Sequence, residues 1–184
     1  MQFRLIILAL GMFVIRTDGF VIAGLLPDIA RATDVTTSSA GQLITIFALV
    51  YAIASPILAS ALGGVERKQL LLGSLAVFVL GNVLVAVSTL YPVLLAGRVI
   101  AALGASTFTP AALVITAALA TPERRGRSIA LVTSGLTIAT IVGVPIGSFI
   151  GAVSGFQNVF WFIVAVGVVV LVLVAWRFPP VAAP

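Results

Sequence analysis

Long apolar stretches separated by short polar breaks run through the whole chain. A helix needs about 20 apolar residues to cross the hydrocarbon core of a bilayer. Stretches of that length predict six transmembrane helices, at roughly 4–27, 40–62, 70–90, 92–119, 127–153 and 157–177. The breaks between them carry turn-forming or charged residues: LPDIARATDVTTSS, GGVERKQ, STLYP, ATPERRGRS and SGFQN. The pattern predicts one all-α membrane domain over residues 1–184, with short loops and no soluble domain.

The first stretch has a second interpretation, because Arg4 before a short apolar run is also typical of a secretory signal peptide. We favour a membrane span, since the apolar run resumes after Gly19 and no A-x-A cleavage site follows. The Lys and Arg residues then orient the chain, because cytoplasmic loops are enriched in them. With alternating spans, only Arg31 falls on the minority side. The other side holds Arg4, Arg67, Lys68, Arg124, Arg125, Arg127 and Arg177, so we expect both termini in the cytoplasm.

A weak internal repeat at an offset of 89 residues places Pro56 on Pro145 and the first span on the fourth. Three spans followed by three of opposite orientation form an inverted-topology pair, from which many transporters are built. We therefore expect a 3+3 inverted repeat.

Composition narrows the function classes. The chain is 61% hydrophobic and 8% charged, and its net charge is +5. In a soluble protein this charge would suggest nucleic acid, but here the basic residues lie between apolar spans and anchor them in the lipid bilayer. Because the chain has no cysteine and no histidine, Cys/His metal sites, haem and a Ser–His protease are excluded. We expect no enzyme activity, no cofactor, no metal and no nucleic-acid partner.

Charged residues inside the predicted spans are the candidates for chemistry. A charge at the bilayer centre costs about 2.5–3.5 kcal/mol on insertion scales, so it usually serves a function. At 1.5 Å per residue, Asp18 lies roughly 12 Å below the outer surface and Arg98 roughly 10 Å below it. If their spans are neighbours, the two can pair around a shared cavity, either as a proton-coupling pair or as a structural salt bridge. Arg16 lies on another face, where it can line the cavity, attract anions or bond to backbone carbonyls.

Polar residues within the spans are candidates for a substrate cavity, and the glycines of the fifth span are candidates for close helix packing. The cavity candidates are Arg16, Gln42, Thr45, Ser106, Thr107, Thr109, Thr133, Thr137 and Thr140. Pro145 favours a bend in the fifth span. The small residues that recur there at every fourth position are Gly135, Ala139, Gly143, Gly147, Gly151 and Gly155. Asn82 is expected to bond between helices.

Five stretches together resemble the N-terminal half of a major facilitator superfamily transporter, in the twelve-span drug:proton antiporter family. They are FVIAGLLPDIA (20–30), AGQLITIFALVYAIASPILA (40–59), GRVIAALGASTFTPAAL (97–113), PERRGRSIAL (122–131) and GVPIGSFIG (143–151). The nearest branch resembles the bacterial chloramphenicol-resistance and arabinose-efflux permeases. The resemblance implies a half-bundle of six helices in the bacterial inner membrane, which exchanges small-molecule substrates for protons.

The resemblance also implies residue roles. Arg98 with Gly104 matches a fourth-span motif associated with proton transfer, and Asp18 matches an acidic position in the first span. In the same way, Gly143, Pro145 and Gly147 match part of an antiporter motif, and Arg67 and Lys68 match the basic end of a loop motif. Two positions depart from these patterns: Gly63 stands where the loop motif has aspartate, and Val144 stands where glycine commonly precedes the proline.

The chain stops at RFPPVAAP, where the central linker of such a transporter would begin. We therefore expect either a fragment whose partner is a missing C-terminal half, or a half-size transporter that pairs with a second copy of itself. The leading prediction is proton-coupled efflux of small hydrophobic compounds or drugs. The alternatives are a non-transporting truncated module or assembly partner, a sugar or metabolite exporter, and a passive channel or uniporter.

Overall fold

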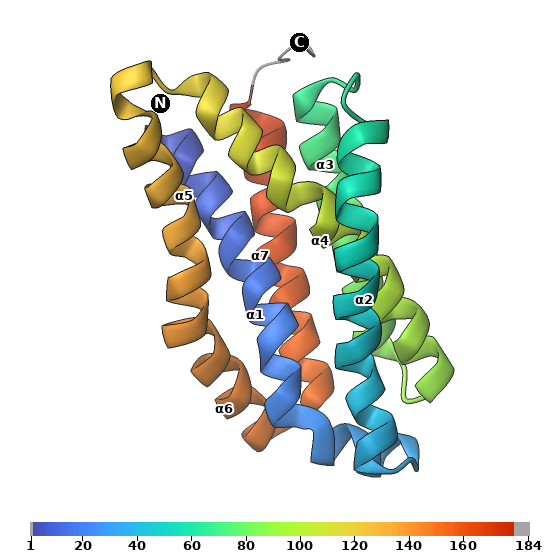
Figure 1. Ribbon diagram of the computed structural model, residues 1–184. Coiled ribbons are helices and arrows are strands. Elements are labelled where there is room, and N and C mark those ends of the chain that lie inside the picture. The colour runs from blue at the N-terminus through green and yellow to red at the C-terminus, as the bar shows by residue number, and fades with distance from the viewer. Residues whose placement is uncertain (1, 179–184) are drawn as a thin grey trace.

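The computed structural model describes residues 2–178 and consists of long helices packed side by side (Figure 1). Each segment long enough to cross a membrane is called a crossing. The first four crossings and the sixth are each a single helix. The fifth, Pro122–Ser154, is built from a short 3-10 turn, two α-helices and a π-helical segment between them. The elements are α1 (Gln2–Thr33), α2 (Thr37–Ala61), α3 (Arg67–Val87), α4 (Tyr91–Leu119), η1 (Pro122–Arg124), α5 (Arg125–Ile138), η2 (Ala139–Gly143), α6 (Val144–Ser154) and α7 (Phe156–Arg177).

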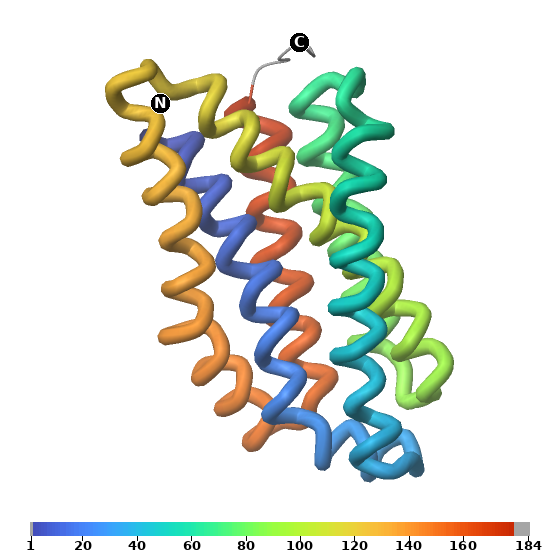
Figure 2. The backbone as a smooth tube through the Cα atoms, in the orientation of Figure 1, coloured from blue at the N-terminus to red at the C-terminus, as the bar shows by residue number. Residues whose placement is uncertain are grey.

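The predicted fold class is confirmed. Six helices are long and apolar enough to cross a membrane, and residues 2–178 contain no strand. The start of α1 and the end of α7 lie at the same end of the bundle (Figure 2). There the Arg4 Nε donates a hydrogen bond to the Arg177 carbonyl at 3.2 Å. The placement of this end in the cytoplasm stays a prediction from the basic loops.

Helix α1 continues beyond the span end that the sequence suggested. The polar break was expected from Leu26, yet the helix runs through Pro27 and ends at Thr33. A proline loses one backbone hydrogen bond but need not end a helix whose neighbours hold it in place. In this last part, Asp28 and Arg31 form an ion pair one turn apart.

The crossings pack in a symmetric pattern. Helix α1 packs on the fifth crossing, and α4, the fourth crossing, packs in the same way on α2, the second. Helix α3, the third crossing, packs on α7, the sixth. Exchanging the first three crossings with the last three reproduces each of these pairs, so the packing favours the predicted inverted repeat. The pattern places α1 between α2 and the fifth crossing (Figure 2).

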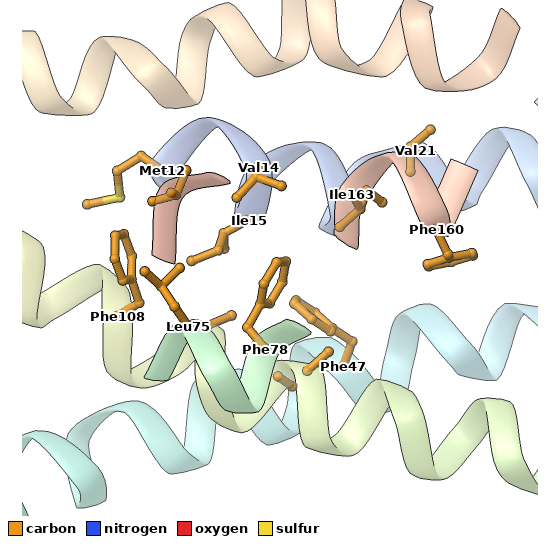
Figure 3. Packing of buried hydrophobic residues seen from close by; sticks show 14 of the residues in the cluster. Met12, Val14, Ile15, Val21, Phe47, Leu75, Phe78, Phe108, Phe160 and Ile163 are labelled. Atoms are coloured by element: carbon orange, nitrogen blue, oxygen red, sulfur yellow. The ribbon is translucent and has the colours of Figure 1, made fainter. Parts of the chain in front are cut away.

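The tightest helix pair is α3 with α4, and glycine permits it. A Cβ built on Gly81 would overlap the backbone of Ala101 and lie 2.6 Å from the Gly97 carbonyl oxygen. Because a backbone cannot turn aside as a side chain can, only glycine allows this approach. Apolar side chains, including Phe78 and Phe108, fill the space between these helices and α1 (Figure 3).

The fifth crossing changes its helical winding beside the predicted bend. The segment Ala139–Gly143 is π-helical, and it ends just before Pro145. A π-turn leaves room for a residue that cannot donate its backbone N–H, so the expected irregularity is present but lies one turn before the proline.

Candidate functional site

Helices α1 and α4 bring together the two charged residues that the sequence placed at one depth. The Arg98 Nη1 donates to the Asp18 Oδ1 at 2.7 Å, and neither side chain is exposed. Among residues 2–178 this is the ion pair that lies fully inside the bundle. A charge-assisted bond of this length is strong, and burial removes the water that would otherwise weaken it.

Two further helices complete the surroundings of the pair. From α2, the Leu43 carbonyl oxygen lies 3.5 Å from the Arg98 Nε, and the Phe47 ring centre lies 4.2 Å from the guanidinium carbon. From α3, the Asn82 side chain lies beside the Asp18 carboxylate. Its amide nitrogen donates to the Phe78 carbonyl at 2.9 Å, so Asn82 is held by its own helix, and the site draws on four helices.

The polar groups at this site are not fully paired with one another. The Asp18 Oδ2, the Asn82 Oδ1 and the Arg98 Nη2 are buried without a hydrogen-bond partner among the described residues. Buried polar atoms are usually satisfied, and each exception asks for an explanation. A carboxylate oxygen with free acceptor capacity, beside an arginine whose charge is permanent, is suited to bind and release a proton.

The prediction that the Asp18–Arg98 pair borders a shared cavity is wrong. A cavity of about 480 Å³ lies between α1, α2, α4 and α5, but neither Asp18 nor Arg98 lines it. Phe47 lines this cavity and also covers the Arg98 guanidinium. The charge pair therefore lies behind the cavity wall, and the Phe47 ring forms part of that wall.

Of the predicted cavity residues, Arg16 and Thr109 line this cavity. The Arg16 guanidinium stacks on the Phe20 ring, with its carbon 3.8 Å from the ring centre. Arg16 is exposed, whereas Asp18 on the other face of α1 is buried, as their spacing predicted.

The other predicted cavity residues lie elsewhere. Gln42 accepts a hydrogen bond from the Tyr91 hydroxyl at 3.1 Å, between the ends of α2 and α4, and Thr45 is exposed. The Ser106 and Thr107 hydroxyls both donate to the Leu103 carbonyl, although Thr107 also borders a smaller cavity of about 220 Å³.

The hydroxyl stripe expected in the fifth crossing bonds mainly to its own helix. Thr133 donates to the Ile129 carbonyl and Thr140 to the Leu136 carbonyl, while Thr137 is exposed. These hydroxyls therefore do not gather at the 480 Å³ cavity, whose lining from this crossing is Leu136.

The aromatic lining of the cavity was not predicted from the sequence. Its α1 face is Ile15, Arg16, Gly19, Phe20 and Ala23, and its α2 face is Ile44, Phe47, Ala48 and Tyr51. The α2 residues, and the α1 residues from Arg16 to Ala23, have the spacing i, i+3, i+4 and i+7, which marks one helix face. This spacing was the available signal, but in helices that are apolar all round it does not separate a cavity face from a lipid face.

The motif glycines of the fifth crossing lie against α1. A Cβ built on any of three of these glycines would meet an α1 side chain. The pairs are Gly143 with Thr17, Gly147 with Val21, and Gly151 with Leu25. A Cβ on Gly135 would overlap the Ala9 carbonyl. Thr17 precedes Asp18, so the fifth crossing directly supports the part of α1 that carries the buried carboxylate.

The basic loop residues begin α3. Arg67 and Lys68 are half-buried, and Arg67 borders the 220 Å³ cavity between α2 and α4. They lie at the opposite end of α2 from Gln42, and neither lines the 480 Å³ cavity.

Sequence comparison decides the family. Residues 8–184 match the profile of the Major Facilitator Superfamily. The chain belongs to this family. It is 38% identical over 176 residues to the uncharacterized MFS-type transporter YbcL of Bacillus subtilis. This match covers 96% of this chain and 45% of that protein. It is also 38% identical over 161 residues to a chloramphenicol resistance protein of Streptomyces lividans, covering 88% of this chain and 41% of that protein.

A solved transporter structure has the same fold. The crystal structure of a bacterial homolog of the human lysosomal transporter Spinster, inward-facing and unoccupied, superposes with a TM-score of 0.85 at 19% identity. The superposition covers 100% of this chain and 44% of that one. The chain is thus a six-helix membrane protein of a transporter superfamily, and it spans slightly less than half the length of the relatives it matches.

Proposed function

We propose that this chain is half of a proton-coupled exporter that moves small hydrophobic compounds across the bacterial inner membrane by alternating access. The observation that carries the proposal is the fully buried pair of Asp18 and Arg98, which the Phe47 ring separates from a cavity of about 480 Å³. Intramembrane ionisable residues are costly, and they usually mark the paths of protons or substrates.

The mechanism follows from competition for the Asp18 carboxylate. While the carboxylate is ionised, Arg98 binds it and ties α1 to α4. A proton on Asp18 removes the attraction and leaves the guanidinium to its other neighbours, Leu43 and Phe47. Because Phe47 also borders the cavity, a substrate that moves this ring changes the access of water to the pair. Proton occupancy and cavity occupancy are thereby linked, which is the thermodynamic requirement for exchange.

The proposed substrate class rests on the cavity and on relatives. The lining is mainly apolar and aromatic, which suits hydrophobic compounds. One relative, 38% identical, is named a chloramphenicol resistance protein, and another, 30% identical, is named a probable sugar efflux transporter. The higher identity of the first favours a drug as the compound exported.

Proton-driven efflux from bacterial cells tests the proposal. In a host without its own major exporters, we expect Asp18→Asn to abolish efflux that depends on the proton gradient, at equal protein level in the membrane. Asp28→Asn is the matched control, because Asp28 lies on the same helix and pairs with Arg31 outside the buried core. Energy-dependent efflux by Asp18→Asn equal to that of the unaltered protein would refute the coupling role.

The other half of the pore is proposed to be a second copy of this chain or a separate C-terminal half. The halves of such transporters are related by an axis along the membrane normal, so two copies with one orientation can face each other. Because the chain has no cysteine, single cysteines report cleanly. A homodimer predicts that Ala48→Cys, at the cavity, crosslinks between copies, whereas Val172→Cys, exposed on α7, does not. Without an Ala48→Cys crosslink, the partner is a different half.

A further inference from the structure

The cavity carries one kind of charge. Of its eleven lining residues, Arg16 alone is ionised at neutral pH, and no acidic residue is among them. An arginine keeps its charge under all physiological conditions, because its delocalised guanidinium does not give up a proton there. The cavity therefore holds a permanent positive charge.

The Arg16 charge is not neutralised within the described part of the chain. The ion pairs of residues 2–178 are Asp18 with Arg98 and Asp28 with Arg31, and Arg16 belongs to neither. Its guanidinium instead lies over the Phe20 ring at 3.8 Å from the ring centre. A stacked guanidinium holds its position while its edge remains free to donate hydrogen bonds.

Three aromatic rings line the same cavity as this guanidinium. Phe20 stacks beneath it, and from α2 the rings of Phe47 and Tyr51 line the same cavity, with ring centres 6.3 Å apart and planes 19° apart. Such a wall accepts a flat apolar body. Together the two features describe a site for a molecule with an apolar or aromatic body and one anionic head.

From this geometry we infer that the substrates are amphiphilic organic anions, whose carboxylate or sulfonate binds Arg16 while the apolar part lies against Phe47 and Tyr51. The inference rests on the proposed function for the identity of the site and narrows its substrate class. If two copies face each other, both Arg16 side chains line one pore, which strengthens the preference. Lipophilic cations are rejected, because the positive charge of Arg16 repels them.

A charge-matched set of probes tests the inference by binding, with no proton gradient present. The probes are 1-naphthoate, the neutral 1-naphthylmethanol and the 1-naphthylmethylammonium cation, which share one ring system. Equilibrium dialysis with the purified protein in nanodiscs of zwitterionic lipid measures their affinities, with empty nanodiscs subtracted. We expect 1-naphthoate to bind about tenfold or more tightly than the cation, with the alcohol between them.

Variants at Arg16 separate its charge from the shape of the site. Arg16→Gln should remove the preference for the anion and leave the affinity for 1-naphthylmethanol within about twofold, and Arg16→Lys should keep part of the preference. Arg31→Gln is the matched control, because this arginine is on the same helix but pairs with Asp28 outside the cavity. It should leave all three affinities unchanged.

Three results would overturn the inference: equal affinities for anion and cation, a preference that survives in Arg16→Gln, or binding of none of the probes. None of these results depends on Asp18 or on proton transport. A failed charge preference with intact proton-driven efflux would thus reject the substrate class alone, whereas lost coupling with an intact preference would reject the coupling role alone.

Discussion

The Asp18 carboxylate and the Arg98 guanidinium lie 2.7 Å apart at a position where both side chains are fully buried. One comes from the first crossing and the other from the fourth, so the bond joins equivalent elements of the predicted inverted repeat. A buried ion pair adds little net stability, because desolvation offsets the attraction, but removal of one partner leaves a buried charge uncompensated. The pair therefore constrains what either residue can be replaced by.

The two single neutralisations are predicted to differ in cost. Asp18→Asn leaves an arginine that cannot lose its proton, and we expect the free energy of unfolding to fall by about 3–5 kcal/mol. Arg98→Leu leaves a carboxylate that becomes neutral by binding a proton, so the loss should be smaller. Denaturation in mild detergent, followed by circular dichroism, measures both. Equal losses, or a larger loss in Arg98→Leu, would contradict the description of the pair as fully desolvated.

Phe47 is predicted to keep protons away from the pair when the cavity is empty. Phe47→Ala removes the ring that covers Arg98 on the cavity side, so we expect a proton leak through proteoliposomes without any substrate. The control is Phe20→Ala, which removes another ring of the same cavity that lies against Arg16 rather than Arg98. A dye trapped in the vesicles reports the leak. If both variants were as tight as the unaltered protein, the Phe47 ring would not be the barrier.

The close approach of α3 and α4 gives a test of the fold that does not involve the charges. Gly81→Ala places a methyl group against the α4 backbone, and we expect a loss of about 1–3 kcal/mol in stability. Gly73→Ala, on the same helix, meets no atom within 4 Å and should be neutral or slightly stabilising. Thermal unfolding of the two variants side by side measures the difference. A destabilised Gly73→Ala with an unaffected Gly81→Ala would mean that the register of these helices is wrong.

The six membrane spans and the depths of Asp18 and Arg98 could be predicted from the sequence, because both follow from helix length and hydrophobicity. Counting residues from the span ends placed Asp18 and Arg98 level, and the structure brings them together. The depth of a residue in the bilayer, however, does not specify how its helix is rotated about its own axis. Thr45 is predicted from the sequence to line the cavity, yet the α2 face that lines it carries Ile44, Phe47 and Ala48.

Rotation about the helix axis is set by which neighbour each face contacts, and that depends on packing over the whole bundle. In α2 the cavity-facing residues are mainly apolar and many exposed residues are apolar too, so polarity gives little information on orientation. The same limit explains the end of α1. Pro27 and the charged residues after it are typical of a loop, but the helix continues to Thr33, where local propensity yields to the contacts of the neighbouring helices.

The most direct test of the account follows proton movement itself. Proteoliposomes that contain the protein and a trapped pH-sensitive dye are given substrate on one side, with no initial pH gradient. We predict that the substrate gradient drives protons in the opposite direction, that Asp28→Asn does the same, and that Asp18→Asn carries substrate down its gradient without moving protons. Substrate-driven proton movement in Asp18→Asn at the rate of the unaltered protein would contradict the claim that this carboxylate couples the two fluxes.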